Sequence, residues 1–128
     1  MIDAYLKEGI CYVATIDSRV IGAVVLHRID ATRIEIKNLA VDEVERGRGI
    51  GTALLRHAER ISRELGFDVL IIGTGNSSLD QLALYQKEGF EMCRIEPNFF
   101  LTNYSEPIVE HGIRCKHLVV LEKKLNEE

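Results

Sequence analysis

The stretch from Ile50 to Leu65 constrains the fold more than any other part of the sequence. Its apolar residues recur at steps of three and four positions, and Gly66 follows directly. This spacing places the apolar side chains on one face of an α-helix, and a glycine just after the last of them is typical of a helix end. We therefore predict a long amphipathic helix that buries one face. Its apolar members are Ile50, Leu54, Leu55, Ala58, Ile61 and Leu65.

Three strand-like segments precede this helix. Ile10 to Ile16 and Val20 to Arg28 are rich in Val, Ile and Tyr around a polar turn, which predicts a β-hairpin. The second is apolar nearly throughout, which favours cover on both faces. In Arg33 to Val41 the apolar alternation slips by one at Asn38, and a bulge that leaves backbone groups unpaired absorbs such a slip. The residues before them, Ile2 to Glu8, resemble the last turns of a helix.

Four further elements are expected after the long helix. They are a buried strand, a second helix and two closing strands, at Val69 to Ile72, Leu79 to Glu88, Phe90 to Ile95 and His117 to Leu121. The connection from Glu96 to Lys116 exceeds the usual loop length of about four to six residues, and long loops are often functional. The element order favours an α/β fold of the α+β kind, a mixed sheet with helices packed on it, in a single domain over residues 1–128.

Composition and charge exclude several classes of protein. The chain is 46% hydrophobic and 28% charged, which is globular rather than disordered composition. Its net charge of -4 offers no general attraction to nucleic acid or to an anionic membrane. No apolar run approaches the ~20 residues that span a bilayer, and the first residues do not resemble a signal peptide. We expect a cytoplasmic protein without nucleic-acid or membrane partners, and without a metal, since its cysteines lack ligand spacing.

A glycine-rich turn lies between the bulged strand and the long helix. From Glu45 to Thr52 the sequence carries three alternate glycines, which let backbone N–H groups point to one place beside the positive end of the helix. Arg46 and Arg48 strengthen the prediction of an anion site, because guanidinium groups suit phosphate oxygens. The same glycines by themselves also fit a flexible turn that only permits a tight entry to the helix.

The pattern Arg46-x-x-Gly49-x-Gly51 opens this long helix directly after a strand that ends with Asn38 to Val41. In this context it resembles the acetyl-coenzyme A motif of the GNAT superfamily of N-acetyltransferases. The resemblance implies that acetyl-coenzyme A is the cosubstrate and that an amine is the acceptor.

A second motif supports the resemblance. Asn76 and the segment Leu84 to Phe90 are similar to the second helix of that superfamily and the strand after it, so the likeness spans roughly Ile10 to Leu121. It implies a GNAT-like, mostly antiparallel sheet. In such a sheet the bulge helps to splay a central parallel pair, which would be Arg33 to Val41 and Val69 to Ile72 in this chain.

The resemblance also implies a division of labour in coenzyme binding. Backbone N–H groups of the turn Arg46 to Thr52 would bind the pyrophosphate, and the backbone of Leu39 to Val41 would pair with the pantetheine arm. The coenzyme-binding residues implied in this way are Leu39, Ala40, Val41, Arg46, Gly47, Arg48, Gly49, Ile50, Gly51, Thr52 and Asn76.

Tyr85 matches the position of the general acid that protonates the departing thiolate in this superfamily. A phenol with a pKa near 10 protonates a thiolate whose conjugate acid lies near 8.5 only with help from positioning, so we expect a contribution of about a hundredfold. The alternative is that Tyr85 extends an apolar helix stripe into the core, with its hydroxyl at the surface.

Three residues are candidates for the base that takes the amine proton, namely Glu35, Glu43 and His27. Glu35 is our choice because it faces opposite Ile34 and Ile36 on the central strand, where it can point into the site. A solvated strand carboxylate explains it equally well. The N–H of Leu39 or of Val41 is a candidate oxyanion donor.

The long connection is expected to shape the acceptor pocket. Its carboxylates favour a cationic amine and its aromatic rings can pack on the carbon skeleton of that amine, although a packed surface loop is the plain alternative. The residues concerned are Phe99, Phe100, Asn103, Tyr104, Glu106 and Glu110.

The N-terminal segment departs from the superfamily pattern. GNAT domains usually begin with a strand and a helix, and only the short stretch before Gly9 is available here, so we expect both to be missing. Either a sheet edge is then exposed, or a second subunit of a homodimer covers it.

Two other functions stay open at this point. One is a non-catalytic acetyl-coenzyme A sensor or interaction module. The other is a dinucleotide-binding domain at Gly73 to Ser78, which follows a strand, opens a helix and has Glu96 near the place of a ribose-binding acid.

Overall fold

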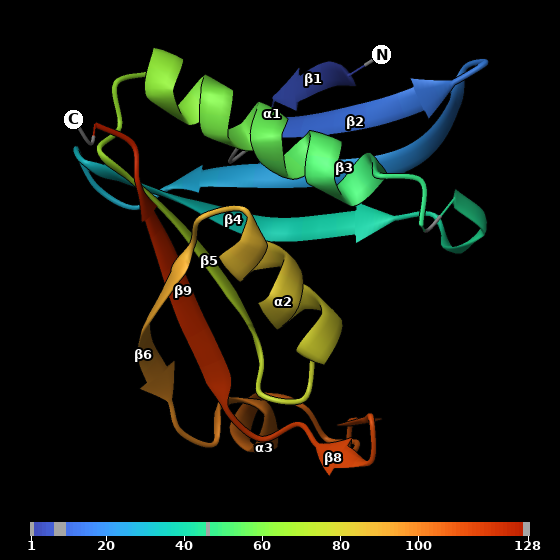
Figure 1. The fold of residues 1–128 in the computed structure, drawn as a ribbon, viewed down its shortest axis with the longest axis vertical. Helices are drawn as coiled ribbons and strands as arrows, with labels where there is room; N and C mark the ends of the chain where they lie inside the picture. Colours follow the sequence, from blue (N-terminus) through green and yellow to red (C-terminus); the bar gives the residue numbers. More distant parts are fainter. Residues whose placement is uncertain (1, 7–9, 46, 127–128) are drawn as a thin grey trace. The chain divides into compact units, whose positions relative to one another are not determined.

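The structure of the chain, a computed structural model, describes residues 2–6, 10–45 and 47–126. They form two compact units, the described residues of Met1–Leu70 with those of Lys124–Glu128, and Ile71–Lys123. Figure 1 traces the elements of both units. The prediction of a single domain over residues 1–128 stays a prediction.

The first unit is built on an antiparallel meander in the order β1-β2-β3-β4. Its strands are β1 (Ile2–Leu6), β2 (Ile10–Ile16), β3 (Arg19–Arg28) and β4 (Arg33–Val41). The predicted hairpin of the second and third strands is confirmed, and its turn residues Asp17 and Ser18 have φ angles of 50° and 67°. Positive φ at both central residues is typical of two-residue hairpin turns.

The predicted helix end at Ile2 to Glu8 is wrong. Ile2–Leu6 is a strand whose five residues all pair with β2, from Ile2 opposite Ala14 to Leu6 opposite Ile10. Residues 7 and 8, which complete the expected segment, lie outside the described part of the chain. A segment of this length is too short to nucleate a stable helix alone, and pairing with β2 supplies the backbone hydrogen bonds instead.

The bulge predicted at Asn38 is confirmed. Val25 of β3 pairs with Asn38, and the next residue, Leu26, pairs with Ile36, so Lys37 is the extra residue of β4. Lys37 and Asn38, the two residues at the bulge, are exposed, whereas Ile36 just before them is buried. The bulge thus changes which side chains of β4 face the interior.

The long amphipathic helix is also confirmed, as α1 (Ile50–Glu64). It packs on β2, β3 and β4, as Figure 1 shows, and buries Leu54 and Leu55. Gly22 of β3 makes the close approach of the helix possible, because a Cβ there would lie 2.9 Å from Leu54 Cδ1. On the face of β3 that points away from α1, Ala23 and Val25 are only half-buried. The strand is therefore not fully buried on both faces, contrary to the prediction.

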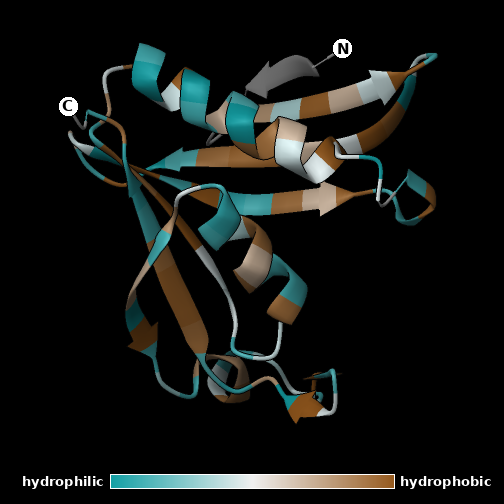
Figure 2. Cartoon of the chain, in the orientation of Figure 1, coloured by the Kyte–Doolittle hydropathy of each residue, from teal (hydrophilic) through white to brown (hydrophobic). Residues whose placement is uncertain are grey.

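The second unit contains the order β5-β9-β6, with β6 and β9 antiparallel. Its main elements are β5 (Val69–Gly75), α2 (Leu79–Lys87), β6 (Glu91–Glu96) and β9 (Leu118–Lys124). Figure 2 shows the hydrophobic stretch of β9, whose residues 119–121 are buried. These elements agree with the four predicted after the long helix, and none of their ends differs from the predicted end by more than three residues.

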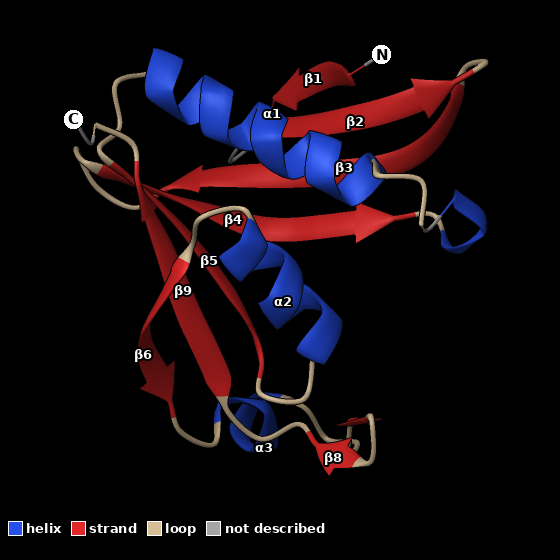
Figure 3. Ribbon diagram, viewed as in Figure 1, coloured by secondary structure: helices blue, strands red, loops and turns tan. Residues whose placement is uncertain are grey.

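The connection between β6 and β9 is more ordered than the predicted loop. It contains a short helix α3 (Phe99–Asn103) and a hairpin of β7 (Val109–Glu110) and β8 (Ile113–Arg114), which Figure 3 distinguishes by colour. The hairpin turns at His111 and Gly112, whose φ angles are 54° and 73°. Elements of two to five residues are too short for hydrophobic periodicity to reveal.

The mixed α/β class with a mostly antiparallel sheet is therefore confirmed. The described residues before the 3-10 helix η1 (Glu43–Glu45) hold strands and turns alone. The splayed parallel pair of β4 and β5 would join the two units and stays a prediction. Within the described residues, no helix is both long and apolar enough to cross a bilayer.

Candidate functional site

The glycine turn before α1 has a backbone that only glycine adopts readily. Gly47 and Gly49 have φ angles of 84° and 77°, in the left-handed region that a Cβ disfavours. A Cβ built at either position would meet no atom within 4 Å. The space beside the turn is therefore open, and no side chain of the turn's glycines covers the backbone.

The start of α1 is uncapped. Gly49 is its N-cap, no side chain caps it, and its first turn contains no acidic residue. Ala53 is the first to bond back, donating its N–H to the Gly49 carbonyl at 3.0 Å. The N–H groups of Ile50, Gly51 and Thr52 precede this bond and have no acceptor within the helix. Together with the helix dipole, they present a positive end suited to an anion.

Glu45 anchors the turn to β3. Its carboxylate accepts a hydrogen bond from Arg19 at 2.9 Å and another from Arg48 at 2.6 Å. Its side chain is only 6% exposed. These two hydrogen bonds, that of Arg19 foremost, hold the pKa of Glu45 below its ordinary value. This role of Glu45 was not predicted from the sequence, where the i,i+3 spacing of Glu45 and Arg48 was the only local signal for it.

Arg48 is consequently held beside the turn. One of its guanidinium nitrogens bonds to Glu45, but its side chain is 64% exposed, so the other N–H donors are accessible. The predicted phosphate contact of Arg48 is compatible with this geometry. Arg46, the other arginine of the motif, lies outside the described residues.

The structure brings the end of β4 to the start of α1. Leu39 and Val41 are half-buried, and Ala40 between them is exposed. A Cβ built on Gly51 would lie 3.6 Å from Val41 Cγ2, in ordinary contact. Two predicted parts of the coenzyme site, the strand segment and the glycine turn, are therefore neighbours within the first unit.

Glu35 lies on the other face of β4. It stands directly opposite His27 on β3, whereas Val41 stands opposite Gly22, which faces α1. The Glu35 carboxylate is 27% exposed and lies 3.4 Å from Lys37 Nζ. Glu43, the third candidate base, is exposed in η1. The structure thus pairs two of the three candidates across one face of the sheet.

Tyr85 is buried in α2. It is 5% exposed, and burial raises the pKa of its phenol to about 12. The ring lies 6.2 Å from that of Phe90. No other described residue forms a hydrogen bond with the Tyr85 hydroxyl. The phenol therefore stays protonated at neutral pH and has a donor to offer.

Asn76 binds the segment that leads into β9. Its Oδ1 accepts hydrogen bonds from the N–H groups of Lys116 at 2.7 Å and His117 at 2.9 Å, and its Nδ2 donates to the Arg114 carbonyl at 3.1 Å. Both acceptor positions of the amide oxygen are thereby used, and one N–H remains. The predicted contact of Asn76 with the coenzyme could use only that donor, and it stays a prediction.

Glu110 ties the hairpin of β7 and β8 to the start of α2. Its Oε1 accepts hydrogen bonds from the hydroxyls of Ser77 and Ser78, each at 2.9 Å. Ser77 is fully buried. Glu110 is therefore committed to the structure of the connection. Glu106, the other carboxylate predicted to attract an amine, has no partner among the described residues.

A pocket of about 300 Å³ lies within the connection. Three of the six residues predicted to shape an acceptor pocket line it, namely Phe100, Tyr104 and Glu106. Phe99, Asn103 and Glu110 do not. The full lining is Phe100, Leu101, Tyr104, Ser105, Glu106, Pro107, Ile108, Arg114 and Cys115.

Arg114 and Cys115 form a wall of this pocket that was not predicted from the sequence. A hairpin folds them back onto the segment before it, and Cys115 N–H donates to the Ile108 carbonyl at 2.7 Å. The turn residues His111 and Gly112 were the available signal, since a glycine between short apolar segments is typical of a hairpin.

The dinucleotide-binding alternative at Gly73 to Ser78 is wrong. Gly73 and Gly75 lie inside β5, and neither has a positive φ. A Cβ on Gly73 would lie 3.0 Å from Leu118 Cδ1, and one on Gly75 would overlap the Cys115 sulfur. These glycines make room for neighbouring side chains rather than for a pyrophosphate.

Known proteins similar to this chain are acetyltransferases. The model of the acetyltransferase (GNAT) family matches residues 2–90. The uncharacterized N-acetyltransferase YvbK of Bacillus subtilis is 42% identical over 121 residues, which cover 94% of this chain and 78% of that protein.

Solved structures agree. A GNAT family acetyltransferase from Elizabethkingia anophelis with acetyl-CoA bound is 44% identical, with a TM-score of 0.90 over 94% of this chain and 79% of that one. A Bacillus subtilis acetyltransferase in complex with CoA is 42% identical, with a TM-score of 0.90 over 94% of this chain and 80% of that one. Both contain the coenzyme that an uncapped, glycine-lined helix start would suit.

Proposed function

Because the chain belongs to the GNAT family of acetyltransferases and is an acyltransferase enzyme, we propose that it transfers the acetyl group of acetyl-coenzyme A to a primary amine of a small molecule or protein. The observation that carries the proposal is the uncapped start of α1 behind two left-handed glycines. The acyltransferase relatives favour an enzyme over the non-catalytic sensor considered above.

The residues of the first unit fit the coenzyme. The N–H groups of Ile50, Gly51 and Thr52 would hold the pyrophosphate, and the accessible donors of Arg48 would add a charge-assisted hydrogen bond. The open space beside Gly47 and Gly49 leaves room for phosphate oxygens. The bulged end of β4, Leu39 to Val41, would present its backbone to the pantetheine arm.

The transfer requires three events. The amine nitrogen, in its neutral form, attacks the thioester carbonyl carbon, the carbon–sulfur bond breaks, and the thiolate gains a proton. The N–H of Leu39 or of Val41 would stabilise the oxyanion. Glu35, or a water molecule that it polarises, would take the proton that the amine loses. Glu35 has polar neighbours, His27 and Lys37, that support such a role.

Tyr85 would act on the sulfur. Proton transfer from a phenol with a pKa of about 12 to a thiolate of pKa near 8.5 is uphill by about 5 kcal/mol, so full protonation needs the reaction itself to drive it. A hydrogen bond from the otherwise unpartnered hydroxyl costs far less and stabilises the developing thiolate. Tyr85 is therefore proposed as the hydrogen-bond donor and final acid.

Thiol release tests this function. The protein is incubated with acetyl-coenzyme A and a panel of primary amines, and free thiol is measured. We expect amine-dependent release, and a stabilisation in thermal unfolding that grows with acetyl-coenzyme A but not with NAD. Binding of acetyl-coenzyme A without thiol release for any amine would return the sensor to consideration. The absence of any binding would overturn the proposal. The homodimer considered above stays a prediction that this experiment does not address.

A further inference from the structure

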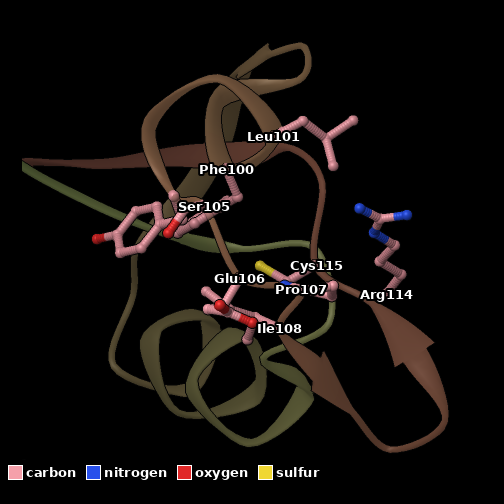
Figure 4. Close-up of a pocket in the computed structure, with 9 residues that line it drawn as sticks. Phe100, Leu101, Ser105, Glu106, Pro107, Ile108, Arg114 and Cys115 are labelled. Carbon is pink, nitrogen blue, oxygen red and sulfur yellow. The ribbon is translucent and has the colours of Figure 1, made fainter.

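The pocket in the connection has two walls from separate segments. One wall follows α3 and carries Tyr104 and Glu106, and the other is the end of the β7–β8 hairpin, which carries Arg114 and Cys115. Figure 4 shows the Cys115 sulfur in the middle of these residues and Arg114 at their outer rim. A ligand in the pocket would therefore meet side chains of both segments.

The charged groups of the two walls are opposite in sign and unpaired. Within the described residues, neither the Glu106 carboxylate nor the Arg114 guanidinium has a hydrogen bond or ion pair. Glu110, the neighbouring carboxylate, is by contrast bonded to two serine hydroxyls. Because the connection satisfies Glu110 but leaves Glu106 and Arg114 unpaired around one cavity, these two are the groups available to a ligand.

Apolar residues contribute to the lining of the pocket, beside its polar groups. Phe100 and Ile108 are half-buried and Cys115 is buried. The rings of Phe100 and Tyr104 lie 5.4 Å apart at 32°. Aromatic rings in this arrangement offer faces to an apolar or aromatic body and to a cation. A cavity of about 300 Å³ is at the lower end of the range for small-molecule sites, so the occupant is small.

We propose that this pocket binds the acceptor amine, and that the acceptor is a small zwitterion: an amine that also carries a carboxylate, joined by an apolar or aromatic body, as in an amino acid with an apolar side chain. Arg114 pairs with the carboxylate, and Glu106 attracts the ammonium. This inference rests on the proposed acetyl transfer. It narrows that proposal to acceptors that carry a carboxylate, because an amine without one would leave the Arg114 guanidinium without a partner in the pocket.

The arginine wall is held in place before any ligand arrives. Asn76 bonds to the carbonyl of Arg114 and to the N–H groups of the two residues that follow Cys115. Phe100 N–H donates to the Lys116 carbonyl at 2.9 Å, which fixes α3 to the same segment. Because this backbone is fixed in advance, only the Arg114 side chain has to become ordered when it pairs with a ligand carboxylate.

Calorimetry with three matched probes tests the inference on the full chain without coenzyme. The probes are phenylalanine, 2-phenylethylamine, which lacks the carboxylate, and 3-phenylpropionate, which lacks the amine. We expect phenylalanine to bind at least about tenfold more tightly than either analogue, because each analogue loses one charge-assisted contact.

Two variants assign the charges. In Arg114→Gln, the advantage of phenylalanine over 2-phenylethylamine should disappear, and in Glu106→Gln its advantage over 3-phenylpropionate should disappear. Arg94→Gln and Glu96→Gln, which alter an ion pair on β6 outside the pocket, should change neither ratio. Arg94, Glu106 and Arg114 are exposed and the Glu96 side chain is 42% exposed, so thermal unfolding should show that each variant folds.

The inference is overturned if phenylalanine binds no more tightly than both analogues, or if its advantages survive in the two pocket variants. Absence of binding by this set and by the corresponding leucine set overturns it as well. These readouts involve no acetyl transfer. If the binding pattern holds but no amine releases thiol from acetyl-coenzyme A, the proposed function fails alone. If amines are acetylated without preference for a carboxylate, this inference fails alone.

Discussion

The turn of residues 47–52 and the connection of residues 97–117 offer a ligand different parts of the chain. The turn offers backbone N–H groups, exposed because three of its residues are glycines without a side chain. The connection offers side chains, carried by segments that long-range hydrogen bonds hold together. A backbone site suits a constant ligand such as a pyrophosphate, whereas a side-chain site can change with the acceptor. The two regions should therefore respond to different kinds of mutation.

The largest expected effect separates chemistry from coenzyme binding. Tyr85→Phe removes the one hydroxyl proposed to act on the sulfur, so turnover should fall by about a hundredfold while affinity for acetyl-coenzyme A stays nearly the same. Steady-state kinetics and calorimetry measure the two quantities. Tyr12→Phe, which removes a hydroxyl from a ring packed on His57, serves as the control. Equal turnover in Tyr85→Phe and the native chain would remove Tyr85 from the mechanism.

The next effect tests the backbone character of the turn. Gly49→Val places a β-branched residue at a φ of 77°, which costs about 1–3 kcal/mol, and directs a side chain into the open space beside the turn. We expect affinity for acetyl-coenzyme A to fall by roughly tenfold to a hundredfold. Gly66→Val carries similar strain at a φ of 88° beyond the other end of α1, and should lose stability without losing affinity. Unchanged calorimetric affinity in Gly49→Val would contradict the turn assignment.

A smaller effect tests the tertiary character of the connection. Asn76→Ala removes three hydrogen bonds to residues 114–117, so the free energy of unfolding should fall by about 1–3 kcal/mol. Urea denaturation measures this loss. Asn103→Ala, which removes one local bond to Phe99, should change stability much less. Comparable losses in the two variants would show that Asn76 does not organise the connection. The predicted coenzyme contact of Asn76 additionally requires a weaker affinity for acetyl-coenzyme A.

The smallest expected effect is on the pH dependence of stability, through His57 of α1. Burial, and secondly Arg60, lower the pKa of His57 from its ordinary 6.5, and its Nε2 is buried without a partner among the described residues. The unfolded chain then takes up the proton first, so stability is lost as the pH falls below 6.5, by at most about 1.4 kcal/mol per pH unit. His57→Gln should flatten unfolding free energies between pH 5 and 7. An unchanged slope in His57→Gln would refute this assignment.

Local sequence patterns predicted most of the first unit and the turn. The hairpin, the bulge at Asn38 and α1 all follow from residues within about four positions of each other. The N-terminal strand did not follow, because its five residues pair with β2 and carry no pattern of their own that excludes a helix end. Register and pairing partners depend on a second segment that periodicity does not identify.

The amino-acid sequence by itself determined the longer elements, the glycine-rich turn and the resemblance to an acetyl-coenzyme A motif, because these depend on backbone preferences and spacing between near neighbours. Tertiary structure decided how the charged side chains are used. It paired Glu45 with Arg19, 26 residues away, and committed Asn76 to a segment about forty residues on. It also left Glu106 and Arg114, around one pocket, without a partner among the residues that the structure describes. Ion pairs and hydrogen bonds act over a few ångströms, and only the folded chain sets which groups come within that reach.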